Sequence, residues 1–415
     1  MLRKLLLTAS AAVFCVGAPL SAANAEKVKI ALIEGLSGPF AANGLAALRE
    51  LEFGVGEFLA GKQIGGGKLD VEVIGLDGQV NPKETLVQLQ NAISQGVTYV
   101  VQGNSSGVAH AIIDAVNKHN ERNPDQRVLF INHSAVDPAL TNEKCSFWHF
   151  RFDGNADMKM NAITDTIKAN KDAKSLYIIG QDYAFGKAVS AAAKSYLGAK
   201  RPDIQVVGDE LHPIGKVKDF TPYVQKIQAS GANVVITGNW GADMVNLARS
   251  ISDLGVKADV YTFYAAGTGV TGTIGESGKN KVFVVGEGHL NPPKTEQNDA
   301  YIKKFKSKFP NDDIIYGRLA VAVDMLGRAM EKAGSVKPVD VAKALEGMEY
   351  TTLAGDKVVM RAADHQLLMP LQIFVHTNEG VKYDYDKSGY GMVTKTSVPS
   401  EQNMTETTCK MDRPS

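Results

Sequence analysis

The sequence predicts an α/β protein made of two lobes, each a parallel sheet flanked by helices. Short β-branched segments alternate with segments of helical apolar spacing over residues 27–131, and this alternation restarts after residue 152. Strands that alternate with helices pair in parallel and are covered on both faces. The chain is also longer than the roughly 250–300 residues at which one hydrophobic core stops growing, so two lobes are expected.

The first 25 residues have the pattern of an export signal. Two basic residues precede an apolar stretch at 5–20, and Ala23-Asn24-Ala25 forms a small-x-small cleavage site. The apolar stretch is shorter than the roughly 20 residues that a membrane-spanning helix needs. Lipid attachment at Cys15 is disfavoured because Phe14 stands where such sites need a small residue. We therefore expect cleavage after Ala25 and a periplasmic location.

Charge and cysteine content limit the possible partners. Residues 26–415 carry 43 basic and 45 acidic residues, a net charge of −2, which provides no field to steer a nucleic acid or an anionic membrane. No nucleic-acid partner is expected, and we expect a monomer.

After cleavage only two cysteines remain, Cys145 and Cys409. In an oxidising compartment this pair predicts one disulfide that ties the C-terminal tail to the middle of the chain.

The first lobe follows the pattern βαβαβαβ. Its strands are expected at 27–33, 69–76, 97–101 and 128–131, and its helices at 45–59, 82–95 and 108–118. Asn81 is the expected N-cap of the second helix, with Pro82 at the first helical position and Glu84 in a capping box. Residues 147–152 alternate in polarity and are expected to pass from one lobe to the other.

The second lobe repeats the alternation and is followed by a helical region. Its strands are expected at 176–179, 205–207, 234–237, 260–263 and 282–285, and its helices at 158–169, 184–196, 220–229 and 244–254. Helices at 301–309, 319–332 and 339–345 follow, then strands at 358–360, 371–375 and 381–385. The expected domains are 26–148 with 289–352, 149–288 with 353–394, and a tail at 395–415.

A Gly-x-Ser-x-Gly turn lies between a predicted strand and a predicted helix at 103–107. One interpretation is an anion site, because glycines permit a tight turn and Ser105 or Ser106 can cap a helix whose free N–H groups attract an anion. A purely structural cap is the second interpretation. The third is the nucleophile of a secreted serine hydrolase, with Asp324 and His365 as partners.

Aromatic residues follow two strands of the second lobe. Tyr183 and Phe185 come after the strand at 176–179, and Trp240 comes after the strand at 234–237. Ligands of open α/β sheets bind at these strand ends, and aromatic side chains there suit a pocket wall. Packing of each loop on its own lobe is the alternative. Asp182 and Asp243 are expected to cap helices rather than to act as catalytic acids.

Two other patterns carry little functional weight. Residues 267–272 match a dinucleotide fingerprint, with Glu287 about 20 residues later, but no crossover helix fits before the next strand. No cofactor is expected. His110 and His119 fall on one helix and His133 and His149 at strand ends, so structural roles are expected and no metal site. No catalytic residue is assigned.

Taken in order and spacing, several segments resemble the periplasmic type I solute-binding proteins of branched-chain amino acid uptake systems. The segments are 27–40, Asn81-Pro82, 103–107, 132–141 and 182–186. The resemblance covers nearly all of the chain after residue 25. It implies two Rossmann-like lobes joined by a hinge of three crossovers, closing on a ligand that passes to the membrane permease of an ABC transporter.

The resemblance also implies a ligand site. In that family the first lobe holds the ligand carboxylate with a serine hydroxyl and backbone N–H groups, and the positions that match here are Ser105, Ser106, Ser134 and Val136. The expected pocket walls are Phe40, Tyr183, Phe185, Trp240 and Tyr264.

Two departures from the family pattern bear on the ligand. Val136 stands where amino-acid binders have a threonine, and residues 263–267 lack the acid that pairs with a substrate ammonium. A desolvated ammonium without an anion is costly, which favours an apolar or aromatic carboxylic acid. A cation–π contact with Trp240 or Tyr264 could still hold an ammonium. An apolar amino acid and an aromatic carboxylic acid therefore both stay open.

Overall fold

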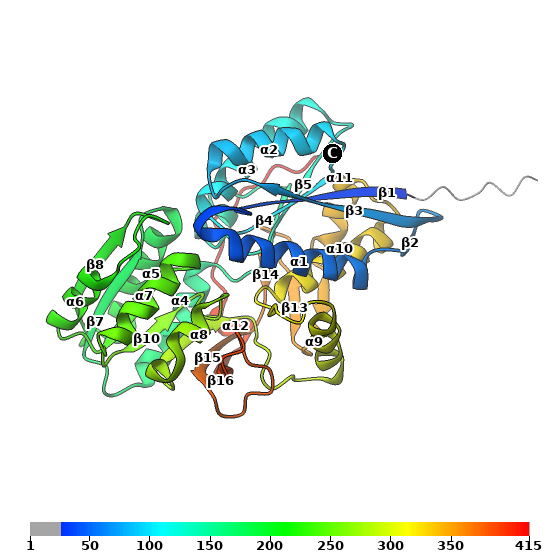
Figure 1. Ribbon diagram of the computed structural model, residues 1–415. Coiled ribbons are helices and arrows are strands. Elements are labelled where there is room, and N and C mark those ends of the chain that lie inside the picture. Colours follow the sequence, from blue (N-terminus) through cyan, green and yellow to red (C-terminus); the bar gives the residue numbers. More distant parts are fainter. Residues whose placement is uncertain (1–25, 415) are drawn as a thin grey trace, which may run out of the picture.

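The computed structural model describes residues 26–414, so the predicted export signal lies outside the described residues. Two sheet-based lobes face each other, with a smaller group of helices and strands beside their junction (Figure 1). The α/β class, the parallel sheets and their helical cover are confirmed.

The first lobe has a six-stranded sheet in the order β2-β3-β1-β4-β5-β6. Its strands are β1 (Glu26–Glu34), β2 (Gln63–Ile64), β3 (Gly67–Asp77), β4 (Tyr99–Gln102), β5 (Leu129–Asn132) and β6 (His149–Arg151). All pairs are parallel except β2 with β3. Its helices are α1 (Ala41–Phe58), α2 (Pro82–Ser94), α3 (Ser106–Arg122), α10 (Arg318–Ala333) and α11 (Pro338–Leu345). Helix α2 packs with α3, and α1 packs with α10.

The second lobe has a seven-stranded sheet in the order β16-β15-β11-β10-β9-β7-β8. Its strands are β7 (Ser175–Gln181), β8 (Gln205–His212), β9 (Val234–Thr237), β10 (Asp259–Thr262), β11 (Val282–Gly286), β15 (Leu371–Thr377) and β16 (Gly391–Val398). Strands β7 to β11 are parallel, while β15 and β16 add an antiparallel edge. The helices are α4 (Ala156–Ala169), α5 (Ala184–Lys200), α6 (Thr221–Ala229), α7 (Gly241–Asp253), α8 (Val270–Ile274) and α12 (Ser400–Asn403).

The chain passes between the two sheets three times. It leaves the first sheet after β6 to form α4, and leaves the second after β11 to form α9 (Glu296–Lys308) and α10. It then forms a small sheet of β12 (Glu349–Thr351), β13 (Lys357–Met360) and β14 (Leu367–Leu368) before returning at β15. Three crossovers are what the resemblance implies. Strand β6 pairs within the first sheet, although the predicted boundary started the second lobe at residue 149; the exact lobe boundaries stay a prediction.

Burial follows the apolar runs from which the strands were predicted. Every residue of β4, β5, β9 and β11 is buried, as expected for central strands covered on both faces, whereas the edge strand β8 is largely exposed or half-buried. The apolar spacing in each lobe therefore builds a core that fixes where each strand ends.

Two local predictions are wrong. Residues 381–385 form no strand, because the side-chain oxygen of Asn291 accepts hydrogen bonds from the N–H groups of Lys382 and Tyr383 at 2.9 and 2.6 Å and holds this segment as a loop. The strand beside β15 is the later β16, which was not predicted. Asn81 caps α2 as predicted, but its own N–H donates to the carbonyl of Gly78, so Glu84 forms no capping box.

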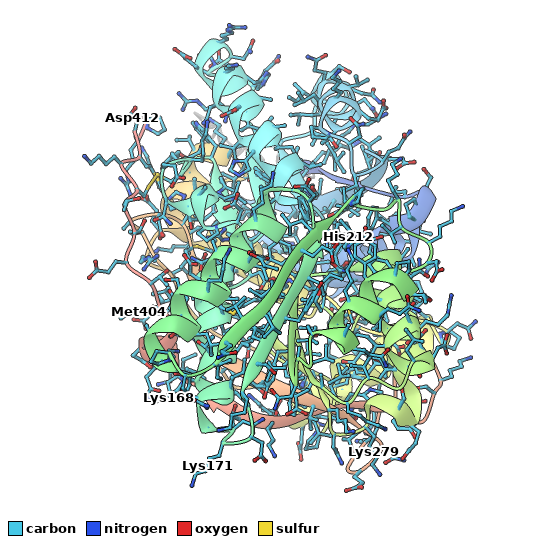
Figure 2. The ribbon with its side chains drawn as sticks, turned by 90° about the vertical axis from the view of Figure 1, so that its left-hand side faces the viewer. Lys168, Lys171, His212, Lys279, Met404 and Asp412 are labelled. Carbon is cyan, nitrogen blue, oxygen red and sulfur yellow. A yellow bond between two sulfur atoms is a disulfide. The ribbon has the colours of Figure 1, made fainter. Side chains whose placement is uncertain are left out.

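The C-terminal tail crosses from the second lobe to the first. Figure 2 shows it running from Met404, beside the second lobe, to Asp412 beside the first. Cys145 and Cys409 form the predicted disulfide, with Cα atoms 5.7 Å apart. Among residues 26–414, no helix combines the length and apolar character that a membrane span requires.

Candidate functional site

A cavity lies between the lobes, where parallel strands of both sheets end. Its volume is about 180 Å³. The lining comes from the segments that follow β4, β5, β7, β9, β10 and β11, and from the residues around the start of α10. Ligand sites of open α/β sheets are found at such strand ends.

Seven of the nine residues predicted for the ligand site line this cavity: Ser105, Ser106, Ser134, Tyr183, Phe185, Trp240 and Tyr264. Two do not. Val136 is buried beside the cavity, and its carbonyl accepts from the N–H of Ala156. Phe40 lies behind the wall, with its ring centroid 4.2 Å from that of Trp240.

The turn between β4 and α3 presents hydrogen-bond donors. Of the two serines that could cap α3, Ser105 is the N-cap, with its Oγ 3.4 Å from the backbone N of Val108. Its φ of 126° lies in a region that non-glycine residues rarely occupy, so this turn is strained. Ser106 Oγ accepts from the N–H of Asp137 at 3.2 Å, which leaves its proton free to donate. Within residues 26–414 the N–H groups of Ser106 and Gly107 have no acceptor.

Asn104 extends this set of donors. Tyr316 donates to Asn104 Oδ1 at 3.0 Å and accepts from Asn43 at 3.2 Å, which fixes the orientation of the Asn104 amide. Its Nδ2 is buried and has no acceptor among the described residues. Gly103 permits the close approach of this turn to the segment that follows β5, because a Cβ there would lie 2.5 Å from the N atom of Ser134.

A chain of hydrogen bonds links this turn to the start of α10. Glu34 Oε1 accepts from the N–H groups of Gly103 and Asn104 and from His133 Nε2, at 2.8, 3.0 and 2.8 Å. His133 Nδ1 lies 2.8 Å from Ser134 Oγ, and Arg318 Nη2 donates to that Oγ at 2.6 Å. These contacts tie Glu34, His133, Ser134 and Arg318 into one buried network. Ser134 Oγ therefore already has two partners within the protein, His133 and Arg318.

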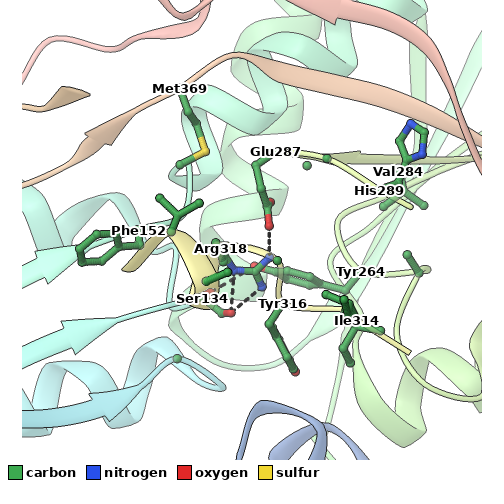
Figure 3. A pocket seen from close by; sticks show the side chains of 18 of the residues that line it. Ser134, Phe152, Tyr264, Val284, Glu287, His289, Ile314, Tyr316, Arg318 and Met369 are labelled. Atoms are coloured by element: carbon green, nitrogen blue, oxygen red, sulfur yellow. Dashed lines mark hydrogen bonds and ion pairs between the residues drawn. The ribbon is translucent and has the colours of Figure 1, made fainter. Parts of the chain in front are cut away.

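Four charged side chains lie together at one side of the cavity: Arg318, Lys159 and Asp153 are buried, and Glu287 is partly buried. Arg318 Nη1 donates to Glu287 Oε1 at 2.8 Å, and Arg318 Nε lies 3.5 Å from Asp153. Lys159 pairs with Asp153 at 2.7 Å and lies over the ring of Tyr264, 5.0 Å from its centroid. Figure 3 shows Arg318 reaching both Ser134 and Glu287 at the centre of the pocket. The positive charges of Arg318 and Lys159 and the negative charges of Glu287 and Asp153 sum to zero.

The ionisation of this cluster follows from its pairing. Burial lowers the pKa of Arg318, but attraction to Glu287 and Asp153 outweighs burial and holds that pKa above its usual value. Burial raises the pKa of Glu287, yet attraction to Arg318 and Lys159 outweighs it, so the pKa is lowered. Both groups therefore stay charged across the physiological pH range.

Aromatic side chains of the second lobe form the opposite wall. Trp240 Nε1 donates to the hydroxyl of Tyr183 at 2.9 Å, which fixes both side chains. Phe185 meets Phe263 edge to face, with ring centroids 5.3 Å apart. Tyr264 crosses to the first lobe and donates to the carbonyl of Ser134 at 3.2 Å. The wall is apolar apart from hydroxyls that already have partners.

Three cavity residues escaped the sequence-based search for ligand contacts. Glu287 directly follows β11 and Arg318 begins α10, so a systematic inspection of strand and helix ends would have found both. Lys159 lies inside α4, where a lysine normally faces solvent, and no local signal marks it as buried.

Other predicted roles are corrected. Asp182 is exposed and pairs with Lys187, so it does not cap α5. Asp243 lies in the first turn of α7, where it accepts from the N–H of Gly215 and from Gln181, and it does not cap that helix.

The hydrolase triad is not assembled. Asp324 accepts hydrogen bonds from Arg328 and Tyr350, and His365 pairs with Glu346 at 2.9 Å. Neither contacts Ser105, so the serine-hydrolase interpretation has no structural support. No group of three or more histidine, cysteine or acidic residues in the described chain could hold a metal ion.

Comparison with known proteins gives consistent matches. A family model described as periplasmic binding protein matches residues 27–380. The Leu/Ile/Val-binding protein homolog 4 of Brucella abortus is 31% identical over 406 residues, which is 94% of this chain and 94% of that protein.

Solved structures of periplasmic and solute-binding proteins also match this chain. The closed form of a leucine-, isoleucine-, valine-, threonine- and alanine-binding protein from Brucella ovis is 29% identical, with a TM-score of 0.82 over 94% of this chain and 100% of that chain. A solute-binding protein of Rhodopseudomonas palustris in complex with p-hydroxybenzoic acid is 18% identical, with a TM-score of 0.75 over 90% of this chain and 98% of that chain, and it shows likeness of fold alone.

Proposed function

Because this chain belongs to the periplasmic binding protein family, we propose that it is the substrate-binding component of an ABC uptake transporter. It binds a small carboxylate ligand in the periplasm, closes over it by bending at the hinge, and delivers it unchanged to a membrane permease. We expect it to act as a monomer. The observation that carries this proposal is a cavity between two lobes that joins a helix N-terminus to an aromatic wall.

The carboxylate is expected at the start of α3. The free N–H groups of Ser106 and Gly107, the hydroxyl of Ser106 and the Nδ2 of Asn104 are all donors without a protein acceptor among the described residues. The positive end of a helix dipole adds to the attraction for an anion. Ser105 contributes by holding the turn, and Ser134 by orienting Arg318.

The remainder of the ligand contacts the aromatic wall. Tyr183, Phe185, Trp240 and Tyr264 offer flat apolar surface suited to either a branched aliphatic side chain or a benzene ring. Phe40 supports Trp240 from the first lobe, and Val136 supports the turn beside Ser134. An apolar amino acid and an aromatic carboxylic acid are the two ligand classes that this site supports, in line with the names of the related proteins.

Contacts between the lobes favour the closed form. The hydrogen bond from Tyr264 to the carbonyl of Ser134 and the ring contact between Phe40 and Trp240 both join the first lobe to the second. Hinge bending that separates the lobes would break them, so ligand and lobe contacts together determine how far the cavity opens.

Small-angle scattering and a thermal-shift screen test this function. Leucine, phenylalanine, benzoate and hydroxycinnamates are screened for a rise in melting temperature, since a ligand that binds only the folded state stabilises it. A compound that binds should lower the radius of gyration and be recovered chemically intact by mass spectrometry.

The variant Ser106→Ala should weaken binding of that compound about tenfold by removing a hydrogen bond to a charged group. Ser94→Ala, which alters an exposed serine of α2, is the control and should bind normally. An unchanged scattering profile at saturation, or a ligand released altered, would contradict the proposal.

A further inference from the structure

Glu287 is more exposed than the three charged side chains that lie beside it. Its side chain is 20% exposed, while those of Arg318, Lys159 and Asp153 are 5%, 1% and 0% exposed. Lys159 pairs with Asp153 inside the protein, and Arg318 also donates to Ser134. Arg318 is the only side chain within residues 26–414 that donates to the Glu287 carboxylate, and it uses Oε1 alone.

An ionised carboxylate has about four acceptor sites, so the Glu287 carboxylate keeps acceptor capacity beside Arg318 and its own backbone N–H. Glu287 follows the last residue of β11 directly and lines the same cavity as the start of α3. An ionised carboxylate accepts hydrogen bonds and cannot donate them. A ligand that fills the cavity and displaces water would leave this capacity unsatisfied unless the ligand supplies a donor, and such a loss is unfavourable.

We propose that Glu287 accepts a hydrogen bond from the ligand, so that the ligand is a carboxylate carrying a second group that donates, either an ammonium or a hydroxyl. This inference rests on the proposed function, which places the carboxylate at α3. Glu287, at the end of β11, would then take the role of the acid that residues 263–267 lack. α-Amino acids and hydroxylated aromatic acids carry this chemistry, and plain aliphatic or aromatic acids lack it.

Calorimetry with matched ligand pairs tests the inference. L-Leucine is compared with 4-methylpentanoate, and 4-hydroxybenzoate with benzoate, because the members of each pair differ by the donor group. The protein should prefer the donor-bearing member of at least one pair by tenfold or more. The pair that shows the preference identifies the donor as ammonium or hydroxyl.

The variant Glu287→Gln should reduce this preference to less than about threefold. Arg318 would keep the amide oxygen as its acceptor, which turns the amide NH₂ toward the donor of the ligand. Glu287→Asp keeps the charge but shortens its reach, and should give an intermediate preference. Glu72→Gln, at an exposed glutamate of β3, is the control and should leave the preference intact.

The possible results separate the two proposals. Equal affinity within both pairs, or a preference that survives in Glu287→Gln, overturns the role of Glu287 and leaves the binding function standing. If Glu287→Gln does not fold, the comparison of pairs in the unaltered protein and in Glu287→Asp decides the question. Failure of all four compounds to bind overturns both proposals.

Discussion

Arg318 is the residue on which the buried carboxylates of the cavity depend. It is 4% exposed, pairs with Glu287 and Asp153, and donates to Ser134. Its planar guanidinium presents five N–H donors in a fixed arrangement and serves Glu287 and Ser134 at once, whereas Lys159 carries a compact ammonium with three donors. Without Arg318, two buried carboxylates would share one cation.

Replacing Arg318 with methionine should therefore destabilise the protein strongly. Removing one partner of a buried ion pair typically costs about 3–5 kcal/mol, because the remaining charge is left without compensation. Urea denaturation of Arg318→Met measures the loss of unfolding free energy. Arg49→Met, at a partly exposed arginine paired with Asp312, is the control and should cost less than about 1 kcal/mol. Equal losses in the two variants would show that the buried pairing is dispensable.

At the scale of elements, Glu50 joins α1 to the segment before α10. Its Oε1 accepts from the N–H groups of Ile315 and Tyr316 at 2.8 and 3.1 Å. Burial raises the pKa of this carboxyl from its ordinary 4.5 to about 8, since the two backbone bonds only partly offset the loss of hydration. The folded protein thus holds a proton here at pH values where the unfolded chain has released it.

This raised pKa predicts a loss of stability with rising pH. The contribution of protonated Glu50 is fully present below about pH 4.5 and is lost as the pH rises through about 8. A difference of this size corresponds to roughly 3–5 kcal/mol. In Glu50→Gln, the pH dependence of unfolding free energy between pH 5 and 8 should be flatter than in the unaltered protein. Parallel curves for the two proteins would mean that Glu50 is ionised in the folded state.

Elements also show what the sequence could and could not predict. The apolar runs in the sequence predict the central strands of both sheets. Tyr183, Trp240 and Tyr264 follow β7, β9 and β10, and all three line the cavity. Lys159 was missed because its burial depends on Asp153, a tertiary contact without local pattern. The strand predicted at 381–385 failed for the same reason, since Asn291 holds that loop from far along the chain.

At the scale of the whole molecule, the C-terminal tail is a fourth connection between the lobes. It leaves α12 beside the second lobe and reaches Cys145, which precedes β6 of the first sheet. Thr407 donates to the carbonyl of Thr141, and Arg413 donates to Glu346. The disulfide makes this connection covalent, so the tail should limit how far the hinge can open.

Removing the disulfide should lower the stability of the protein and increase the size of its unliganded form. The double variant Cys145→Ser/Cys409→Ser should lose about 2–5 kcal/mol of unfolding free energy, because the disulfide closes a long loop and restricts the unfolded chain. Its radius of gyration without ligand should rise, while the value with ligand stays unchanged, since ligand contacts hold the lobes together. Met404→Ala, at an exposed tail residue, keeps the disulfide and serves as the control. An unliganded variant no larger than the control would show that the hinge alone sets the opening, and that the tail contributes only stability.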